Sequence, residues 1–177
     1  MTLVTSSDGT RIEYTTDGAG PGLVVVSGAL LAGKDYRALT QKLRTTFTVH
    51  AMDRRGRGGS GAQGARYSIE RECEDLDAVL RETGARYVFG HSYGGLVALQ
   101  GALRLPSRID GVAAFEPAVS VDASLPSAFM PAAAEAIARR RYGRAMALVL
   151  TGLELAGPLG RLPMPLLSGI AALMLHT

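Results

Sequence analysis

An apolar run, a serine flanked by glycines and an Ala/Leu-rich run follow one another directly in ARYVFGHSYGGLVALQGAL, residues 85–103. The first run has the composition of a buried strand, and the last has that of a helix. Only Gly90-His91-Ser92-Tyr93-Gly94 is left for the turn between them. Because glycine adds no side chain, the chain can reverse sharply there with the serine at the apex. The stretch therefore predicts a strand–turn–helix unit, the building block of an α/β protein.

Segments of the same two kinds alternate along the chain as far as Pro117. Before them, two alternating runs around Asp8-Gly9 predict an N-terminal β-hairpin over residues 2–18. Strands that alternate with helices at this spacing imply a mostly parallel sheet with helices on both faces, which is an α/β fold. Further strands are predicted at 22–28, 47–53 and 108–117, with helices at 35–47 and 68–84.

The composition changes after Pro117. Residues 126–177 are rich in Ala, Leu and Arg and show no strand pattern. We therefore expect a core over residues 1–120 and a helical, cap-like segment over residues 121–177, laid over the sheet rather than folded as a separate domain. Helical runs in this segment are predicted at 131–142, 144–155 and 166–175.

Charge and cysteine content argue against several classes of function. The net charge is only +3, and the arginines gather at residues 54–57 and 139–144, where we expect a solvated or anion-attracting surface rather than a nucleic-acid site. Cys73 is the only cysteine, so no internal disulfide or thiolate metal cluster can form. The N-terminus has no apolar signal segment, and the apolar C-terminal run is broken by prolines. These features predict a cytoplasmic protein with no metal, cofactor, nucleic-acid or membrane partner.

The turn at Ser92 carries the chemistry. A turn between strand and helix lifts the serine hydroxyl above the sheet, at the positive end of the helix that follows. The backbone N–H of Tyr93 then points to the place where an oxyanion would develop, and the N–H of Ala29, after the strand at 22–28, is the expected second donor. The alternative is a glycine-rich turn in which the serine is incidental.

The order of the hairpin, VVVSGAL, FTVHAMDRRGRGGSG, YVFGHSYGGLVAL and VAAFEP resembles the α/β-hydrolase fold family, in its serine esterase-like branch. The resemblance covers Thr2 to Pro117, and the helical remainder is similar to the family's cap. It implies a serine hydrolase that acts on an ester or related acyl compound. The apolar cap favours a small hydrophobic acyl group. Esterase, amidase, lactonase, C–C hydrolase and perhydrolase activities all use such a turn.

The chain departs from the family pattern in two places. Ser27-Gly28 stands where the family often has His-Gly, a change that leaves the backbone donor available. The family also continues past the cap through two further strands, and the loop after the last of them carries the catalytic histidine. Here the last strands of the usual fold are absent, because the sequence stops at Thr177.

None of the histidines is a convincing general base. His91 precedes Ser92 directly, so the turn directs its side chain away from the hydroxyl. His50 lies within the strand at 47–53 and is expected to be buried. His176 is the penultimate residue, and nothing in the sequence holds it near the serine.

The candidate acid is Glu116. Some members of the family place the acid at the end of the strand after the nucleophile helix, which is the position of Glu116 here. A carboxylate there could orient an imidazole, although Glu116 could instead pair with an arginine. Asp53 also ends a strand, but the arginine-rich loop after it offers structural partners.

Three explanations of the missing base stay open. The chain is a fragment of a longer enzyme, which we favour, or a second polypeptide completes it, or it is a non-catalytic binding protein. Self-association or a complementing C-terminal segment would fit an exposed sheet edge. A remaining rival is a phosphate-binding loop, because GALLAGKD at 28–35 nearly matches that motif, but Asp35 stands where the motif needs a hydroxyl.

Overall fold

The computed structural model of the chain describes residues 1–122 and 124–174. By its internal contacts the chain divides into two compact parts, which we call the core unit (Met1–Ala118) and the helical unit (Val119–Thr177). The expectation that the helical segment is laid over the sheet stays a prediction.

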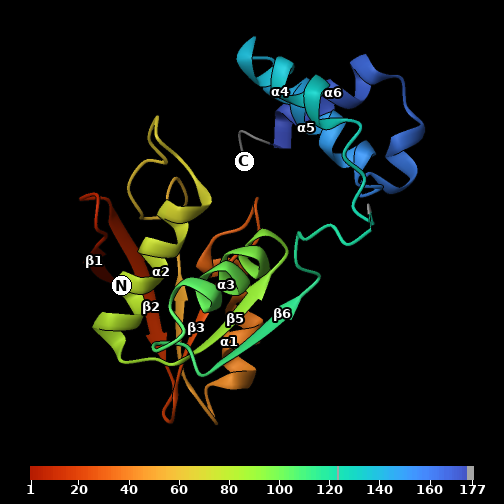
Figure 1. Cartoon of the computed structure of the whole chain (residues 1–177). Helices are drawn as coiled ribbons and strands as arrows, with labels where there is room; N and C mark the ends of the chain where they lie inside the picture. The colour runs from red at the N-terminus through yellow and green to blue at the C-terminus, as the bar shows by residue number, and fades with distance from the viewer. Residues whose placement is uncertain (123, 175–177) are drawn as a thin grey trace. The chain divides into compact units, whose positions relative to one another are not determined.

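Within the described residues, six strands form one sheet in the order β1-β2-β4-β3-β5-β6 (Figure 1). The N-terminal hairpin is antiparallel and joins the sheet through an antiparallel pairing of β2 with β4, whereas the other neighbours are parallel. The predicted α/β fold with a mostly parallel sheet is confirmed. The strands are β1 (Thr2–Thr5), β2 (Arg11–Asp17), β3 (Gly22–Val26), β4 (Thr48–Met52), β5 (Tyr87–His91) and β6 (Gly111–Phe115).

Both faces of the central strand β3 are buried, which explains its unbroken run of valines. Val24 and Val26 point to the side of the two longer helices, and Val25 points to the opposite side. Helices consequently cover both faces, α2 and α3 on one and α1 on the other (Figure 1). The helical elements of the core unit are η1 (Gly33–Tyr36), α1 (Arg37–Leu43), α2 (Ile69–Thr83) and α3 (Tyr93–Arg104).

The edge strand β6 differs from the central strands in its exposure. Its last residues are largely accessible, and the side chain of Phe115 is 57% exposed. A strand in this position presents unpaired backbone groups along its outer side. The end of β6 lies beside the end of β5, where His91 pairs with Phe115, and is therefore next to the turn that contains Ser92.

The helical unit is built from α4 (Met130–Ala138), α5 (Tyr142–Gly152), η2 (Gly157–Arg161) and α6 (Met164–Met174). Its core is a small cluster around Ala147, Leu167 and Ala171, where α5 packs on α6. The first predicted helix was too long, since α4 ends at Ala138 and not at residue 142. The reason is a left-handed backbone at Arg140, whose φ of 56° cannot continue an α-helix.

Candidate active site

Ser92 lies between the end of β5 and the first residue of α3, as the sequence predicts, in a backbone conformation that is unusual for a residue with a side chain. Its φ is 53° and its ψ is −120°. Such a conformation costs free energy and persists only where the surroundings enforce it. The backbone around Ser92 packs so closely that the flanking positions have room only for glycine. A Cβ at Gly90 would lie 2.3 Å from the carbonyl oxygen of Gly94, and one at Gly94 would lie 2.2 Å from that of Val26.

Backbone hydrogen bonds fix the turn against the neighbouring strand. The N–H of Ser92 donates to the carbonyl of Phe115 at 2.9 Å, and the N–H of Ala118 donates to the carbonyl of Ser92 at 3.1 Å. The same Ser92 carbonyl accepts from Gly95 at 2.9 Å and so begins α3. The serine is half-buried. The residue is therefore held in a strained conformation from both sides while part of it reaches solvent.

The loop after β3 runs beside this turn, because Val26 pairs in register with Gly90. A Cβ added to Gly28 would lie 3.6 Å from the Cβ of Ser92. The N–H of Gly28 is already used, since it donates to the hydroxyl of Tyr36 at 3.0 Å. The next N–H along the loop is that of Ala29, the predicted second oxyanion donor. Among the described residues, no backbone carbonyl accepts from the N–H of Ala29 or of Tyr93.

Glu116 follows β6 directly and is exposed. Its φ of 46° is a second strained backbone position next to the serine turn. Phe115 and Ala118, which both form backbone hydrogen bonds with Ser92, lie on either side of it. Within the part of the chain that the structure describes, no ion pair involves Glu116. The carboxylate is thus not held by an arginine, and its role as the acid stays a prediction.

The described histidines have other partners than Ser92. The Nδ1 of His91 shares a hydrogen bond of 2.7 Å with the hydroxyl of Tyr36. His50 is 6% exposed, its Nδ1 lies 3.0 Å from the hydroxyl of Thr16, and burial lowers its pKa. The third histidine, His176, lies outside the described residues. The structure therefore assigns no base to the serine.

Two arginines of the loop after β4 are buried, so the expectation of a solvated or anion-attracting surface was wrong for them. Arg54 and Arg55 are only 1% and 2% exposed. Each forms an ion pair with a fully buried carboxylate of α2, Arg54 with Glu72 and Arg55 with Asp75. The pairs satisfy charges that would otherwise be very costly to bury. A signal was present in the sequence, because Glu72 and Asp75 flank the apolar face of α2.

Several backbone donors of the rival phosphate-binding loop are already used. The N–H of Ala32 donates to the carboxylate of Asp35 at 2.9 Å, and the N–H of Gly33 donates to that of Asp53 at 2.7 Å. A phosphate cradle needs such amides free to face an anion, whereas here carboxylates lie against them. Asp53 also accepts from the N–H of Gly59 at 3.0 Å, so the arginine-rich loop after β4 supplies it with a structural partner, as expected from the sequence.

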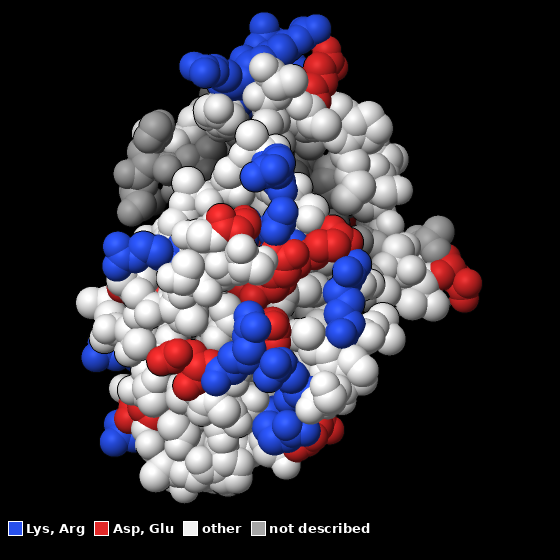
Figure 2. Space-filling view, turned by 60° about the vertical axis from the view of Figure 1, so that its left-hand side comes forward, with Lys and Arg blue, Asp and Glu red and all other residues white. Residues whose placement is uncertain are grey.

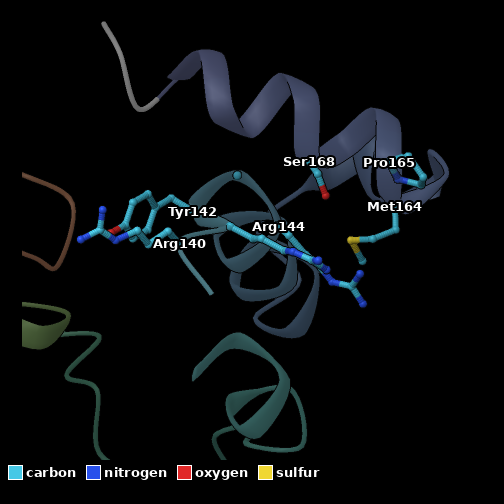
Figure 3. A pocket seen from close by; sticks show the side chains of 8 residues that line it. Arg140, Tyr142, Arg144, Met164, Pro165 and Ser168 are labelled. Carbon is cyan, nitrogen blue, oxygen red and sulfur yellow. The ribbon is translucent and has the colours of Figure 1, made fainter. Parts of the chain in front are cut away.

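The helical unit contains a hollow of about 540 Å³ bordered by several arginines. Figure 3 shows the side chains of Arg140 and Arg144 extending in different directions from this hollow, with Ser168 and Met164 on the neighbouring helix. The guanidinium groups of Arg140 and Arg144 therefore do not converge on one point.

The surface shows both signs of charge side by side. On the face drawn in Figure 2, Lys and Arg alternate with Asp and Glu rather than forming one basic field. Within the described ranges, no group of three or more His, Cys, Asp or Glu side chains is arranged to hold a metal ion. None of the helices in those ranges has the length and hydropathy needed to cross a bilayer.

Comparison with known proteins agrees with this architecture. Residues 21–157 match the sequence model of the serine aminopeptidase S33 family. The chain therefore belongs to this family of α/β hydrolases. Its structure superposes with a TM-score of 0.77 on an α/β hydrolase from Sphaerobacter thermophilus, with 35% sequence identity, and the match covers 99% of this chain and 71% of that one.

The curated relatives of the chain include an esterase and a haloperoxidase. Over 105 residues the chain is 30% identical to a pimeloyl-[acyl-carrier protein] methyl ester esterase of Aliivibrio salmonicida, a match that covers 56% of this chain and 37% of the relative. Over 117 residues it is 34% identical to a non-heme haloperoxidase of Rhodococcus erythropolis, with coverage of 62% and 43%. The chain thus spans less than half the length of these curated relatives.

Proposed function

We propose that Ser92 is the nucleophile of an acyl-transfer hydrolase that acts on an ester or a related acyl compound. The observation that carries the proposal is the backbone conformation of Ser92, whose φ is 53°. The residues that flank it are glycines, at positions where a Cβ would clash with the neighbouring backbone. Strain of this kind is maintained at functional sites, and a serine at such a strand–helix turn is the nucleophile elbow of α/β hydrolases.

The remaining groups have roles that follow from their positions. The free N–H groups of Ala29 and Tyr93 would stabilise the oxyanion of a tetrahedral intermediate. Glu116, exposed at the end of β6, would orient an imidazole that takes the serine proton. The base itself would come from outside the described residues, from the remainder of a longer enzyme or from a complementing C-terminal segment. No metal or organic cofactor is needed for this chemistry.

The substrate class rests on the relatives and on the helical unit. One of the relatives is a methyl ester esterase, which supports a carboxylic ester as the substrate. The helical unit exposes apolar side chains such as Leu155 and Leu166, which fits a small hydrophobic acyl group. Esterase activity is accordingly the first to be assayed.

The test is covalent labelling of the full chain with a fluorophosphonate, followed by peptide mass spectrometry. We expect the label on Ser92 and its loss in Ser92→Ala. The matched control is Ser120→Ala, which removes an exposed serine of the helical unit. Added imidazole should accelerate the labelling, since it supplies the missing base, and Glu116→Gln should reduce that acceleration.

The outcomes separate the candidate functions. Labelling of Ser92 that imidazole accelerates supports an enzyme that lacks only its base. A label spread over several exposed serines, unchanged by Ser92→Ala, would refute the nucleophile and favour the non-catalytic binding protein. Labelling that Glu116→Gln leaves unaffected would exclude Glu116 as the acid.

A further inference from the structure

Arg54 is buried beside the serine turn, where it contacts the loop after β3 and the ring of Tyr93. Its Nε donates to Glu72 at 3.0 Å, and its Nη1 donates to the carbonyl of Gly28 at 3.2 Å. Its guanidinium carbon lies 4.5 Å from the centre of the Tyr93 ring. One side chain therefore touches the loop after β3 and the first residue of α3.

The contact with Gly28 determines the direction of a neighbouring donor. The carbonyl of Gly28 and the N–H of Ala29 belong to the same peptide group, and the chain contains no cis peptide bond within its described residues. In a trans peptide these two bonds point in opposite directions. The hydrogen bond from Arg54 draws the carbonyl inward, so the N–H of Ala29 faces away from the arginine. A second bond to that carbonyl, from the N–H of Leu31 at 3.3 Å, supports the same orientation.

The contact with Tyr93 fixes the other donor. A guanidinium over an aromatic face is an attractive arrangement, and it is stronger where water is excluded. The Tyr93 hydroxyl is also held, because it lies 2.9 Å from the hydroxyl of Tyr67, which in turn donates to Glu72 at 2.9 Å. Burial, together with the Tyr93 hydroxyl and Glu72, raises the pKa of Tyr67, so its hydroxyl stays protonated as a donor. The ring of Tyr93 thus has little freedom, and its backbone N–H at the start of α3 is held with it.

We propose that Arg54 is a positioning residue that aligns the backbone N–H groups of Ala29 and Tyr93 on a single oxyanion. The proposal rests on the nucleophilic role of Ser92 set out above. Arg54 does not touch the substrate. It acts through the Gly28 carbonyl and the Tyr93 ring, while Glu72 compensates its charge in the interior.

The adjacent Arg55 provides a matched control. It is as deeply buried as Arg54 and pairs with Asp75 at 2.7 Å, but its side-chain partners are carboxylates rather than groups of the serine turn. Replacing both members of a buried ion pair by apolar residues is often tolerated, because no lone charge is left behind. The test variants are therefore Arg54→Met with Glu72→Met, and Arg55→Met with Asp75→Met. Arg54→Lys and Arg55→Lys serve as a milder pair if the double variants do not fold.

The first readout is the rate of fluorophosphonate labelling of Ser92. Loss of one oxyanion donor lowers rates about 10²–10³-fold, so we expect a loss of roughly 10²-fold in the Arg54 double variant and less than about 3-fold in the control. Arg54→Lys should fall between them, since it keeps the charge beside Glu72 but not the planar contact with Tyr93. Equal losses in both double variants would reduce Arg54 to a structural role and overturn the proposal.

The second readout does not depend on the reactivity of Ser92. In ¹H–¹⁵N spectra of the unliganded protein, the amide signals of Ala29 and Tyr93 should move together in the Arg54 variants and stay in place in the Arg55 variants. Unmoved signals in the Arg54 variants would overturn the proposal. If the native chain is not labelled at all, the nucleophile proposal fails, whereas these spectra still decide whether Arg54 holds the two amides.

Discussion

The core unit and the helical unit differ most in what they bury. The core unit places an arginine–glutamate pair and an arginine–aspartate pair in its interior, beside a large apolar cluster on one face of the sheet. Among the described residues of the helical unit, the buried side chains are alanines and one leucine, Leu167. Its large apolar side chains are mostly accessible, and Leu173 is 71% exposed.

Because of this difference, the stability of the two units should respond differently to substitution. Buried ion pairs tolerate little change, because the loss of one partner leaves an uncompensated charge in the interior. In the helical unit, a cluster of small side chains can relax to fill the space that a removed methyl group leaves. Exposed ion pairs are already solvated, so the loss of one partner costs little. Substitutions of the same kind should therefore have unequal effects in the two units.

The largest contrast is expected for ion pairs. Arg55→Met leaves the fully buried Asp75 without its partner and should lower the free energy of unfolding by about 3–5 kcal/mol. Arg139→Met removes a pair with Glu135 in which both side chains are 60% exposed, and should change it by less than about 0.5 kcal/mol. Urea denaturation followed by circular dichroism measures both. Equal losses would contradict the comparison.

Apolar truncations should differ by less. Leu76 of α2 is 0% exposed and its side chain lies next to Gly101 of α3, so Leu76→Ala should cost about 3–4 kcal/mol. Leu167 is 2% exposed but belongs to a cluster of small side chains, and Leu167→Ala should cost about 2 kcal/mol. The same denaturation experiment measures both values. A larger loss at Leu167 would mean that the helical unit is the more tightly packed part.

The single thiol should report on the core unit alone. Burial raises the pKa of Cys73 to about 11, above its unfolded value near 8.5. The folded state therefore binds the thiol proton more tightly, and this contribution is lost as the pH rises from about 8.5 towards 11. Cys73→Ala should remove a slope of up to about 1.4 kcal/mol per pH unit over that range. A thiol reagent that labels the native protein at pH 8 as fast as it labels a free thiol would contradict the burial of Cys73.

The smallest effects should have opposite signs. Gly169 lies in α6, and an added Cβ there meets nothing within 4 Å, so Gly169→Ala should stabilise the protein by about 0.5–1 kcal/mol. Gly101 lies in α3, where a Cβ would lie 2.9 Å from the side chain of Leu76. Crowding there should cancel or reverse the same gain in helix propensity. Thermal unfolding of both variants checks the signs, and stabilisation by Gly101→Ala would show that Leu76 can move aside.

Local sequence pattern was enough for the order of elements and for the turn at Ser92. The valines of β3, the spacing of Cys73, Leu76 and Leu80 in α2 and the glycines around Ser92 are all signals among near neighbours. A strand or helix depends mainly on such neighbours, because its period places successive side chains on one face. The hairpin, the parallel strands and the serine turn were therefore predictable.

Only the tertiary structure decided which polar residues are buried and which donors are free. Arg54 and Glu72 are 18 residues apart, and Arg55 and Asp75 are 20 apart, so their pairing depends on how the loop after β4 returns to α2. The amide of Gly33, which bonds to Asp53 from the start of η1, is also 20 residues away along the chain. A charged side chain is buried only where a partner compensates the loss of water, and that partner is supplied by the fold rather than by the neighbouring sequence. For this reason the sequence predicted an exposed basic loop where the structure has two buried arginine–carboxylate pairs.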